Sequence, residues 1–208
     1  MKLIIVRHAE TTENRKERGR FHGHTHGKLS KKGREQARKL AHRLFREKID
    51  VVYCSDLNRT KQTLMPYLKL HKVKVIYTKE LREGHMGIFT GKTRDDYLAW
   101  KESESGKKWL AKFGKNLDWA FPKGESSKDL QKRAARIVEK IIKKERGKNV
   151  LIMTHAKTKI MMLMHLLNRE YKTYRKKYNP PNTALSVIYI KDNGNHRARL
   201  INNLGHLK

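Results

Sequence analysis

Apolar residues along the chain follow two spacings, and each spacing predicts a different element. Short runs rich in branched apolar residues, such as 2–6 and 149–154, predict buried strands. Segments in which apolar residues recur every third or fourth position, such as 128–144, predict amphipathic helices. The predicted strands are 2–6, 50–54, 73–77, 149–154, 185–190 and 199–201, and the predicted helices are 30–48, 57–70, 128–144 and 157–167. This alternation predicts an α/β fold, a three-layer α/β/α sandwich around a mostly parallel central sheet.

The pattern changes between 84 and 124, where glycines, polar residues and scattered aromatic side chains replace the regular spacing. We interpret this stretch as a small, partly helical cap inserted into a single domain that spans 1–208. Its aromatic residues predict a satellite core under the cap, and stacking against a substrate is the alternative. These residues are Tyr97, Trp100, Trp109, Phe113, Trp119 and Phe121.

The chain is strongly basic, with 50 Lys and Arg against 20 Asp and Glu among 208 residues and a formal net charge of +30. Such a field attracts polyanions and steers anionic substrates, so nucleic-acid binding is one hypothesis. The basic residues are spread along the whole chain, however, and no RNP1 stretch, GXXG loop or zinc-finger spacing accompanies them. We therefore favour basic residues on solvated faces, and nucleic acid is not the favoured partner.

Cysteine content and hydropathy indicate the compartment. The single cysteine, Cys54, cannot form an intramolecular disulfide. No stretch approaches the roughly 20 consecutive apolar residues of a membrane-spanning helix, and 2–6 is too short for the apolar part of a signal peptide. We expect a soluble cytoplasmic protein that does not bind a membrane, and the sequence is compatible with a monomer or a homodimer.

Residues suited to phosphate chemistry occur at the ends of predicted strands or in the loops just after them. In open α/β sheets such positions meet at the edge where ligands bind. A single histidine at a strand end is more often structural than catalytic, so the inference depends on the joint order of four motifs. They are Arg7-His8-Ala9-Glu10-Thr11, Ser55-Asp56-Leu57-Asn58-Arg59-Thr60, Leu81-Arg82-Glu83-Gly84 and Thr154-His155-Ala156.

The order, spacing and flanks of these motifs resemble the histidine phosphatase superfamily, the phosphoglycerate mutase-like proteins, along essentially the whole chain. That family opens with a strand and an Arg-His pair, continues with a Ser-Asp-Leu motif that contains an Arg, and closes with a strand that ends in a second His. The matching residues are Arg7, His8, Ala9, Thr11, Asn14, Leu29, Ser30, Gly33, Gln36, Ala37, Ser55, Asp56, Leu57, Arg59, Gln62, Thr63, Leu81, Arg82, Glu83, Gly87, Gly91, Gly124, Glu125, Ser126 and His155. The resemblance implies a phosphoglycerate mutase-like fold and phosphoryl-transfer chemistry.

The resemblance implies catalytic roles for five residues. His8, neutral at one ring nitrogen, attacks phosphorus and forms a phosphohistidine that water later cleaves. Arg7 and Arg59 offer bidentate donors to the phosphoryl oxygens, and His155 is a third donor when it is protonated. Glu83 is the general acid for the leaving oxygen and then the base for water. Because the cationic groups neutralise the phosphoryl charge, we expect no metal and no cofactor.

The segment after the first strand contains the predicted substrate-binding residues, which are Asn14, Thr11, His22 and Gly23. In a strand, His22, His24 and His26 would share one face, a spacing that suits zinc or nickel, so a metal site is the alternative for this loop. No fourth ligand can be named for it. In the family these three positions often hold Gln or Thr, then Trp, then Asp, so the loop contacts differ here.

The family contains phosphatases and mutases, and the residues after the acid discriminate between them. Cofactor-dependent mutases carry Glu-Arg-His-Tyr-Gly at the acid and an Arg pair in a longer cap, whereas this chain has no adjacent arginines at 94–121. An aromatic residue between two glycines, as in Gly87-Ile88-Phe89-Thr90-Gly91, is typical of the phosphatase branch. We expect a metal-independent phosphomonoester hydrolase that acts on a small phosphate ester. A bisphosphoglycerate-dependent mutase and an inactive polyanion-binding protein are the alternatives.

Overall fold

The computed structural model describes residues 1–12, 20–113, 118–170, 179–191 and 194–208. Within these residues six strands form one sheet in the order β3-β2-β4-β1-β5-β6. The strands are β1 (Lys2–Arg7), β2 (Val51–Ser55), β3 (Lys74–Thr78), β4 (Asn149–Thr154), β5 (Leu185–Ile190) and β6 (His196–Asn203). Strands β1 to β4 pair in parallel, and β5 runs antiparallel to both of its neighbours. The predicted mostly parallel sheet is confirmed.

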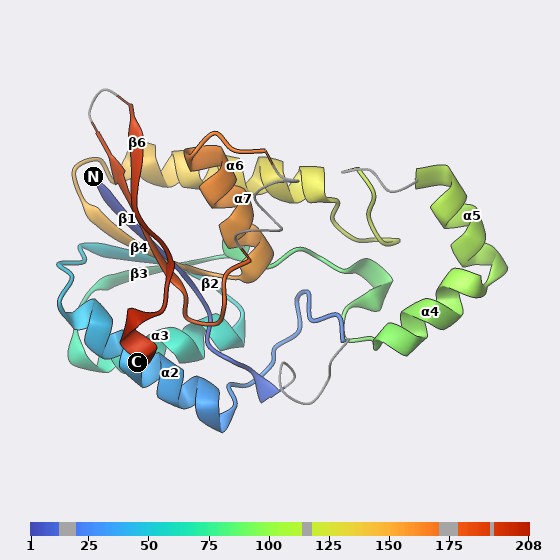
Figure 1. Cartoon of the computed structure of the whole chain (residues 1–208), viewed down its shortest axis with the longest axis horizontal. Coiled ribbons are helices and arrows are strands. Elements are labelled where there is room, and N and C mark those ends of the chain that lie inside the picture. Colours follow the sequence, from blue (N-terminus) through green and yellow to red (C-terminus); the bar gives the residue numbers. More distant parts are fainter. Residues whose placement is uncertain (13–19, 114–117, 171–178, 192–193) are drawn as a thin grey trace.

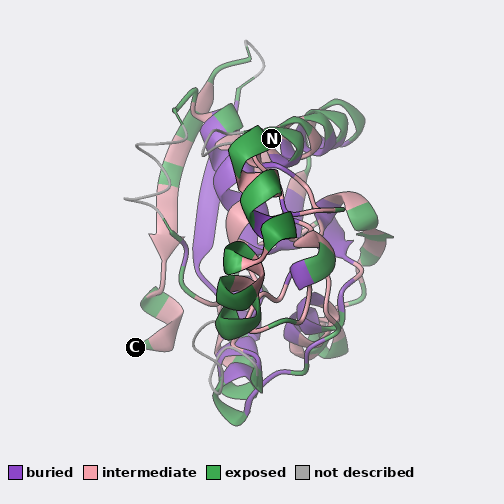
Figure 2. Ribbon diagram, turned by 90° about the vertical axis from the view of Figure 1, so that its right-hand side faces the viewer, coloured by how far each residue is buried: buried purple, intermediate pink, exposed green. Residues whose placement is uncertain are grey.

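Helices cover both faces of the sheet and complete the predicted three layers (Figure 1). They are α2 (Lys31–Phe45) and α3 (Asn58–Leu70) on one face, and α6 (Ser127–Lys144) and α7 (Ala156–Leu166) on the other. The apolar spacing of each helix decides which side it buries, as α6 shows with Leu130, Ala134, Ile137 and Ile141 against the sheet. The four inner strands are accordingly buried, while the edge strands β3 and β6 and the outer helix faces are partly or fully exposed (Figure 2).

The segment predicted as a cap is partly helical, with α4 (Arg94–Glu102) and α5 (Glu104–Phe113) extending to one side of the sheet (Figure 1). At its base Phe121 is 9% exposed, and its ring centroid lies 4.8 Å from Phe89, 5.2 Å from Phe21 and 4.6 Å from Trp119. These rings pack on one another as the satellite core that the sequence predicts. The Phe113 side chain lies outside the described part of the chain.

None of the helices described is both long and apolar enough to cross a lipid bilayer.

Candidate active site

The predicted catalytic residues converge at the carboxyl edge of the parallel strands. Arg7, the last residue of β1, pairs with Thr154, the last residue of β4, so His8 and His155 emerge side by side. The His8 backbone N–H donates to the Thr154 carbonyl at 3.0 Å, and the two imidazole centroids are 5.2 Å apart. The register of two adjacent strands therefore places both histidines within reach of one phosphoryl group.

His8 is held in the tautomer that a nucleophile needs. Its Nδ1 lies 2.7 Å from the Ala9 carbonyl, which can only accept, so Nδ1 carries the proton and Nε2 keeps its lone pair. The ring is 4% exposed, and burial lowers the pKa of His8 well below its usual value. The charges of Arg59 and Arg7 lower this pKa further. A neutral imidazole with a free Nε2 is the reactive form.

The segment 180–184 fixes the backbone of His8, although no sequence motif pointed to it. The His8 carbonyl accepts from Asn182 Nδ2 at 3.0 Å and from the Thr183 backbone N–H at 3.3 Å. Thr183 has a φ of +57°, which is costly for a β-branched residue. Its hydroxyl oxygen is 3.1 Å from His206 Nε2, so the C-terminal end of the chain supports this strained residue.

Arg59 has a buried guanidinium group whose orientation is fixed by three hydrogen-bond acceptors of the protein. The side chain is 3% exposed, and its Nε–H donates to His155 Nδ1 at 3.1 Å. Its Nη1 donates to the Thr25 carbonyl at 2.7 Å and its Nη2 to the Gly23 carbonyl at 2.8 Å. Gly23, predicted to contact substrate, has a φ of +46°, a backbone conformation that suits glycine. It thus presents its carbonyl to Arg59.

His155 was expected to donate to the phosphoryl group when it is protonated, and in this structure both of its ring nitrogens contact protein groups. The ring is fully buried, its Nδ1 accepts from Arg59, and its Nε2 lies 2.8 Å from Ser55 Oγ. Burial, and then the Arg59 charge, lower the pKa of His155 well below its usual value. The ring is therefore neutral in this structure, with its proton on Nε2. A phosphoryl dianion would favour its protonation.

Arg7 is a second cation at the same edge. Its Nη1 donates to the Pro180 carbonyl at 2.7 Å. Its Nε is buried and has no hydrogen-bond partner among the residues described. A buried N–H without an acceptor is costly, and an anion bound within hydrogen-bond distance of this nitrogen would satisfy it.

Glu83 lies at the amino end of α7, where backbone N–H groups bind its carboxylate. Oε1 accepts from the N–H groups of Gly84 at 3.1 Å, Lys157 at 3.2 Å and Thr158 at 3.3 Å. The start of α7 follows His155 directly, so the same strand end positions both the second histidine and the Glu83 carboxylate. Unlike the histidines, Glu83 is only half-buried.

The other residues predicted to bind substrate, His22, Thr11 and Asn14, do not all lie beside His8 in the part of the chain that the structure describes. His22 is close enough to His8 to lower the pKa of that ring. Thr11 is buried, and its backbone forms an isolated bridge with Leu29. Asn14 lies outside the described residues.

Two of the three histidines considered as metal ligands have surroundings that differ from those of a metal ligand. His24 Nε2 is 2.7 Å from the Glu83 carbonyl and must donate to it, which removes that nitrogen as a ligand. His26 is exposed. In the described parts of the chain, no group of three or more His, Cys, Asp or Glu side chains is arranged to hold a metal ion.

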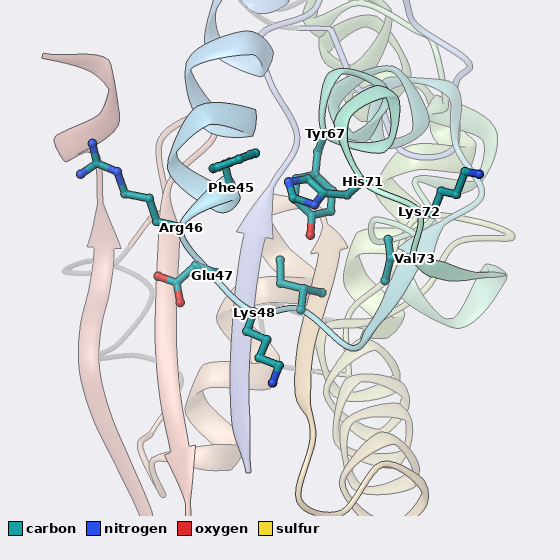
Figure 3. A pocket seen from close by; sticks show the side chains of 9 residues that line it. Phe45, Arg46, Glu47, Lys48, Tyr67, His71, Lys72 and Val73 are labelled. Atoms are coloured by element: carbon teal, nitrogen blue, oxygen red, sulfur yellow. The ribbon is translucent and has the colours of Figure 1, made fainter.

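A separate hollow of about 390 Å³ lies at the opposite edge of the sheet, between the last turns of α2 and α3 (Figure 3). The rings of Phe45, Tyr67 and His71 form part of its wall. None of the predicted catalytic residues lines it. The chemistry-bearing side chains are gathered at the carboxyl edge, which is the candidate active site.

A comparison with protein families agrees with this geometry. The model of the histidine phosphatase superfamily, branch 1, matches residues 3–203. The chain belongs to this superfamily.

Named relatives of this histidine phosphatase include both phosphatases and phosphoglycerate mutases. It is 29% identical over 195 residues to phosphoserine phosphatase 1 of Hydrogenobacter thermophilus, covering 94% of this chain and 89% of that protein. It is 31% identical over 195 residues to the metal-independent phosphoserine phosphatase of Arabidopsis thaliana, covering 91% and 76%. The structure of YhfR from Bacillus stearothermophilus superimposes with a TM-score of 0.86 at 24% identity, covering 100% of this chain and 99% of that one, which shows the shared fold.

Proposed function

We propose that this histidine phosphatase is a metal-independent phosphomonoester hydrolase that works through a phosphohistidine on His8. One observation carries the proposal: His8 is buried and neutral, its Nδ1–H is tied to the Ala9 carbonyl, and Arg59 and His155 lie beside it. A free Nε2 next to fixed cationic donors is the arrangement that an in-line attack on phosphorus requires.

In the first step His8 Nε2 forms a bond to phosphorus while the ester P–O bond breaks. Arg7 and Arg59 stabilise the negative charge on the equatorial oxygens, and Glu83 in its acid form gives its proton to the leaving alcohol oxygen. The products are the free alcohol, the Glu83 carboxylate and phosphohistidine.

In the second step the Glu83 carboxylate takes a proton from water as the water oxygen attacks phosphorus. The N–P bond breaks, inorganic phosphate leaves, and His8 regains its neutral form. Glu83 holds the proton that the next turnover needs. Two steps through one intermediate replace a single difficult displacement by water.

The substrate in this proposal is a small phosphate monoester, and phosphoserine is the first compound to try because two relatives are named for it. The chain works as one domain in which 84–124 forms a cap at the mouth of the site. No metal or cofactor takes part.

The test compares the native chain with His8→Ala on phosphoserine, 3-phosphoglycerate and p-nitrophenyl phosphate, with a chelator present. We expect chelator-resistant release of phosphate that His8→Ala abolishes, and an acid-labile phosphoenzyme in the native chain only. Phosphate release that persists in His8→Ala, or that the chelator abolishes, would overturn the proposal. Isomerisation that exceeds hydrolysis when bisphosphoglycerate is added would indicate a mutase instead.

A further inference from the structure

The turn at 80–83, which contains the proposed general acid, accepts several hydrogen bonds from Arg133 of α6. Arg133 Nη1 donates to the Glu80 carbonyl at 2.6 Å and to the Arg82 carbonyl at 3.0 Å. Its Nη2 donates to the Glu83 carbonyl at 3.4 Å. Three of the four carbonyls in the turn thus share one guanidinium, which fixes the path of the backbone into Glu83.

The other edge of the same guanidinium binds a carboxylate that reaches the far side of the turn. Arg133 Nε and Nη2 donate to the two oxygens of Glu125, each at 2.7 Å. Glu125 Oε2 in turn accepts from the His85 backbone N–H at 3.3 Å. The Arg133–Glu125 pair is only about 15% exposed on each side chain, so little water competes with it. It therefore holds the backbone both before and after Glu83.

The sheet supplies the remaining contacts to the turn. Thr154 Oγ1 donates to the Leu81 carbonyl at 2.7 Å, and Thr158 Oγ1 donates to the Arg82 carbonyl at 2.7 Å. These hydroxyls anchor the turn to β4 and α7, which are rigid elements. Arg133 adds the tie to α6, whose neighbouring residue Ala134 is fully buried.

We infer that Arg133, braced by Glu125, is a positioning residue for the general acid Glu83, an inference that rests on the proposed function. Proton transfer to a leaving oxygen requires the acid within hydrogen-bond reach in one orientation. A planar fork can hold several carbonyls and a carboxylate at once, whereas an ammonium group cannot reproduce that geometry. Arg133 itself touches no reacting atom.

This role has a signature that general destabilisation of the fold lacks. An alkyl phosphate releases a poor leaving group and depends on the acid, whereas p-nitrophenolate leaves readily without a proton. The ratio kcat/KM covers the steps up to formation of the phosphoenzyme, so it reports the acid step directly. Loss of Arg133 should therefore lower kcat/KM much more for the alkyl ester than for the activated ester.

The experiment measures kcat/KM on glycerol 2-phosphate and p-nitrophenyl phosphate for Arg133→Met, Arg133→Lys, Glu125→Gln and Glu83→Gln. For Arg133→Met we expect a loss of about 100-fold on the alkyl ester and less than about tenfold on the activated ester. Inhibition by inorganic phosphate should stay unchanged, because the buried cations are untouched. Arg133→Lys and Glu125→Gln should show the same selectivity with smaller losses.

Arg136→Met is the matched control on the same helix. Arg136 is exposed and, among the residues described, binds only the Glu80 side chain, at 3.3 Å, so we expect activity within about twofold of the native chain on both esters. If Arg133→Met does not fold, Arg133→Lys and Glu125→Gln carry the test, with thermal unfolding measured for each.

Equal losses on both esters, or no loss, in the Arg133 and Glu125 variants would overturn the inference if Glu83→Gln still discriminates between the esters. If Glu83→Gln itself shows no discrimination, or His8→Ala retains turnover, the proposed function fails instead. Added guanidinium that restores hydrolysis of the alkyl ester by Arg133→Gly would support the positioning role directly.

Discussion

The two halves of the proposed active site are built in different ways. The nucleophile wall, which we define as His8, Arg59 and His155, is 4%, 3% and 0% exposed. Strand ends and backbone carbonyls place these side chains. The acid turn, which we define as residues 80–85, is half-buried except for Leu81 and Gly84, which are buried, and side chains from three other elements hold its backbone.

This difference in burial matches the different requirements of phosphate binding and of proton transfer. A buried wall keeps both histidines neutral and strengthens the field of the guanidinium groups, because little water screens them. An acid that serves first a leaving alcohol and then water must stay accessible to both. We therefore expect substitutions in the wall to affect every substrate, and substitutions around the turn to affect substrates selectively.

The largest effect should follow from Arg59→Lys. An ammonium group cannot bind the carbonyls of Gly23 and Thr25, His155 Nδ1 and a phosphoryl oxygen together. We expect kcat/KM to fall by about 1,000-fold on alkyl and activated esters alike, with weaker inhibition by inorganic phosphate. Arg38→Lys, at an exposed position of α2, is the control and should match the native chain. A loss confined to the alkyl ester would contradict the division between the wall and the turn.

A smaller loss should follow from Asn182→Ala, which removes one of the two donors to the His8 carbonyl. The Thr183 N–H remains, so the nucleophile shifts but keeps its tautomer. We expect kcat to fall by about tenfold on both esters, with thermal stability nearly unchanged. Steady-state kinetics and the yield of acid-labile phosphoenzyme measure it. An unchanged kcat would show that the segment 180–184 does not position His8.

Binding of a phosphate analogue should be linked to proton uptake by the wall. Burial keeps the pKa of His155 well below its usual value, so the ring is neutral at pH 7.5, and a bound dianion raises that pKa. Tungstate titrated calorimetrically in buffers of different ionisation enthalpy should reveal up to about one proton taken up per site. The uptake should be lost in His155→Gln. Proton release, or an equal uptake in His155→Gln, would assign the linkage to another group.

His8 and His155 should also make the free energy of unfolding depend on pH, which is the smallest effect that we predict. In the unfolded chain His8 and His155 bind protons as the pH falls through about 6.5, whereas burial lowers both pKa values in the folded chain. The unfolded state then binds more protons, so the free energy of unfolding falls from pH 7 to pH 5. Each such group contributes about 1.4 kcal/mol per pH unit once its unfolded form is protonated. Urea unfolding at pH 7, 6 and 5 should show a shallower slope for His155→Gln.

The sequence predicted most strands of this fold to within a residue or two, and it predicted the edge strand β6 least completely. The predicted strand 149–154 coincides with β4, which is flanked on both sides and buried. The predicted strand 199–201 is only the middle of β6 (His196–Asn203). As an edge strand, β6 alternates exposed residues such as Arg197 and Arg199 with half-buried ones, so its apolar run is short.

The predictions for the site were limited in a similar way by distance along the chain. The motifs named the five residues proposed for catalysis, because each motif lies within a few residues of a strand end. Asn182 and Arg133 escaped notice, since each acts through a contact with a residue remote in sequence. Arg133 binds a carbonyl 53 positions away, and Asn182 binds one 174 positions away.

By itself the sequence determined the order of strands and helices, because the spacing of apolar residues is a local property that decides which face each element buries. It also determined which chemical groups stand at the strand ends. Only the tertiary structure decided that His155 is neutral and that the Gly23 carbonyl accepts a hydrogen bond from Arg59. It also decided that Arg133 of α6 binds the backbone carbonyls of the turn that contains Glu83. These properties depend on burial and on hydrogen bonds between distant segments, which no local pattern encodes.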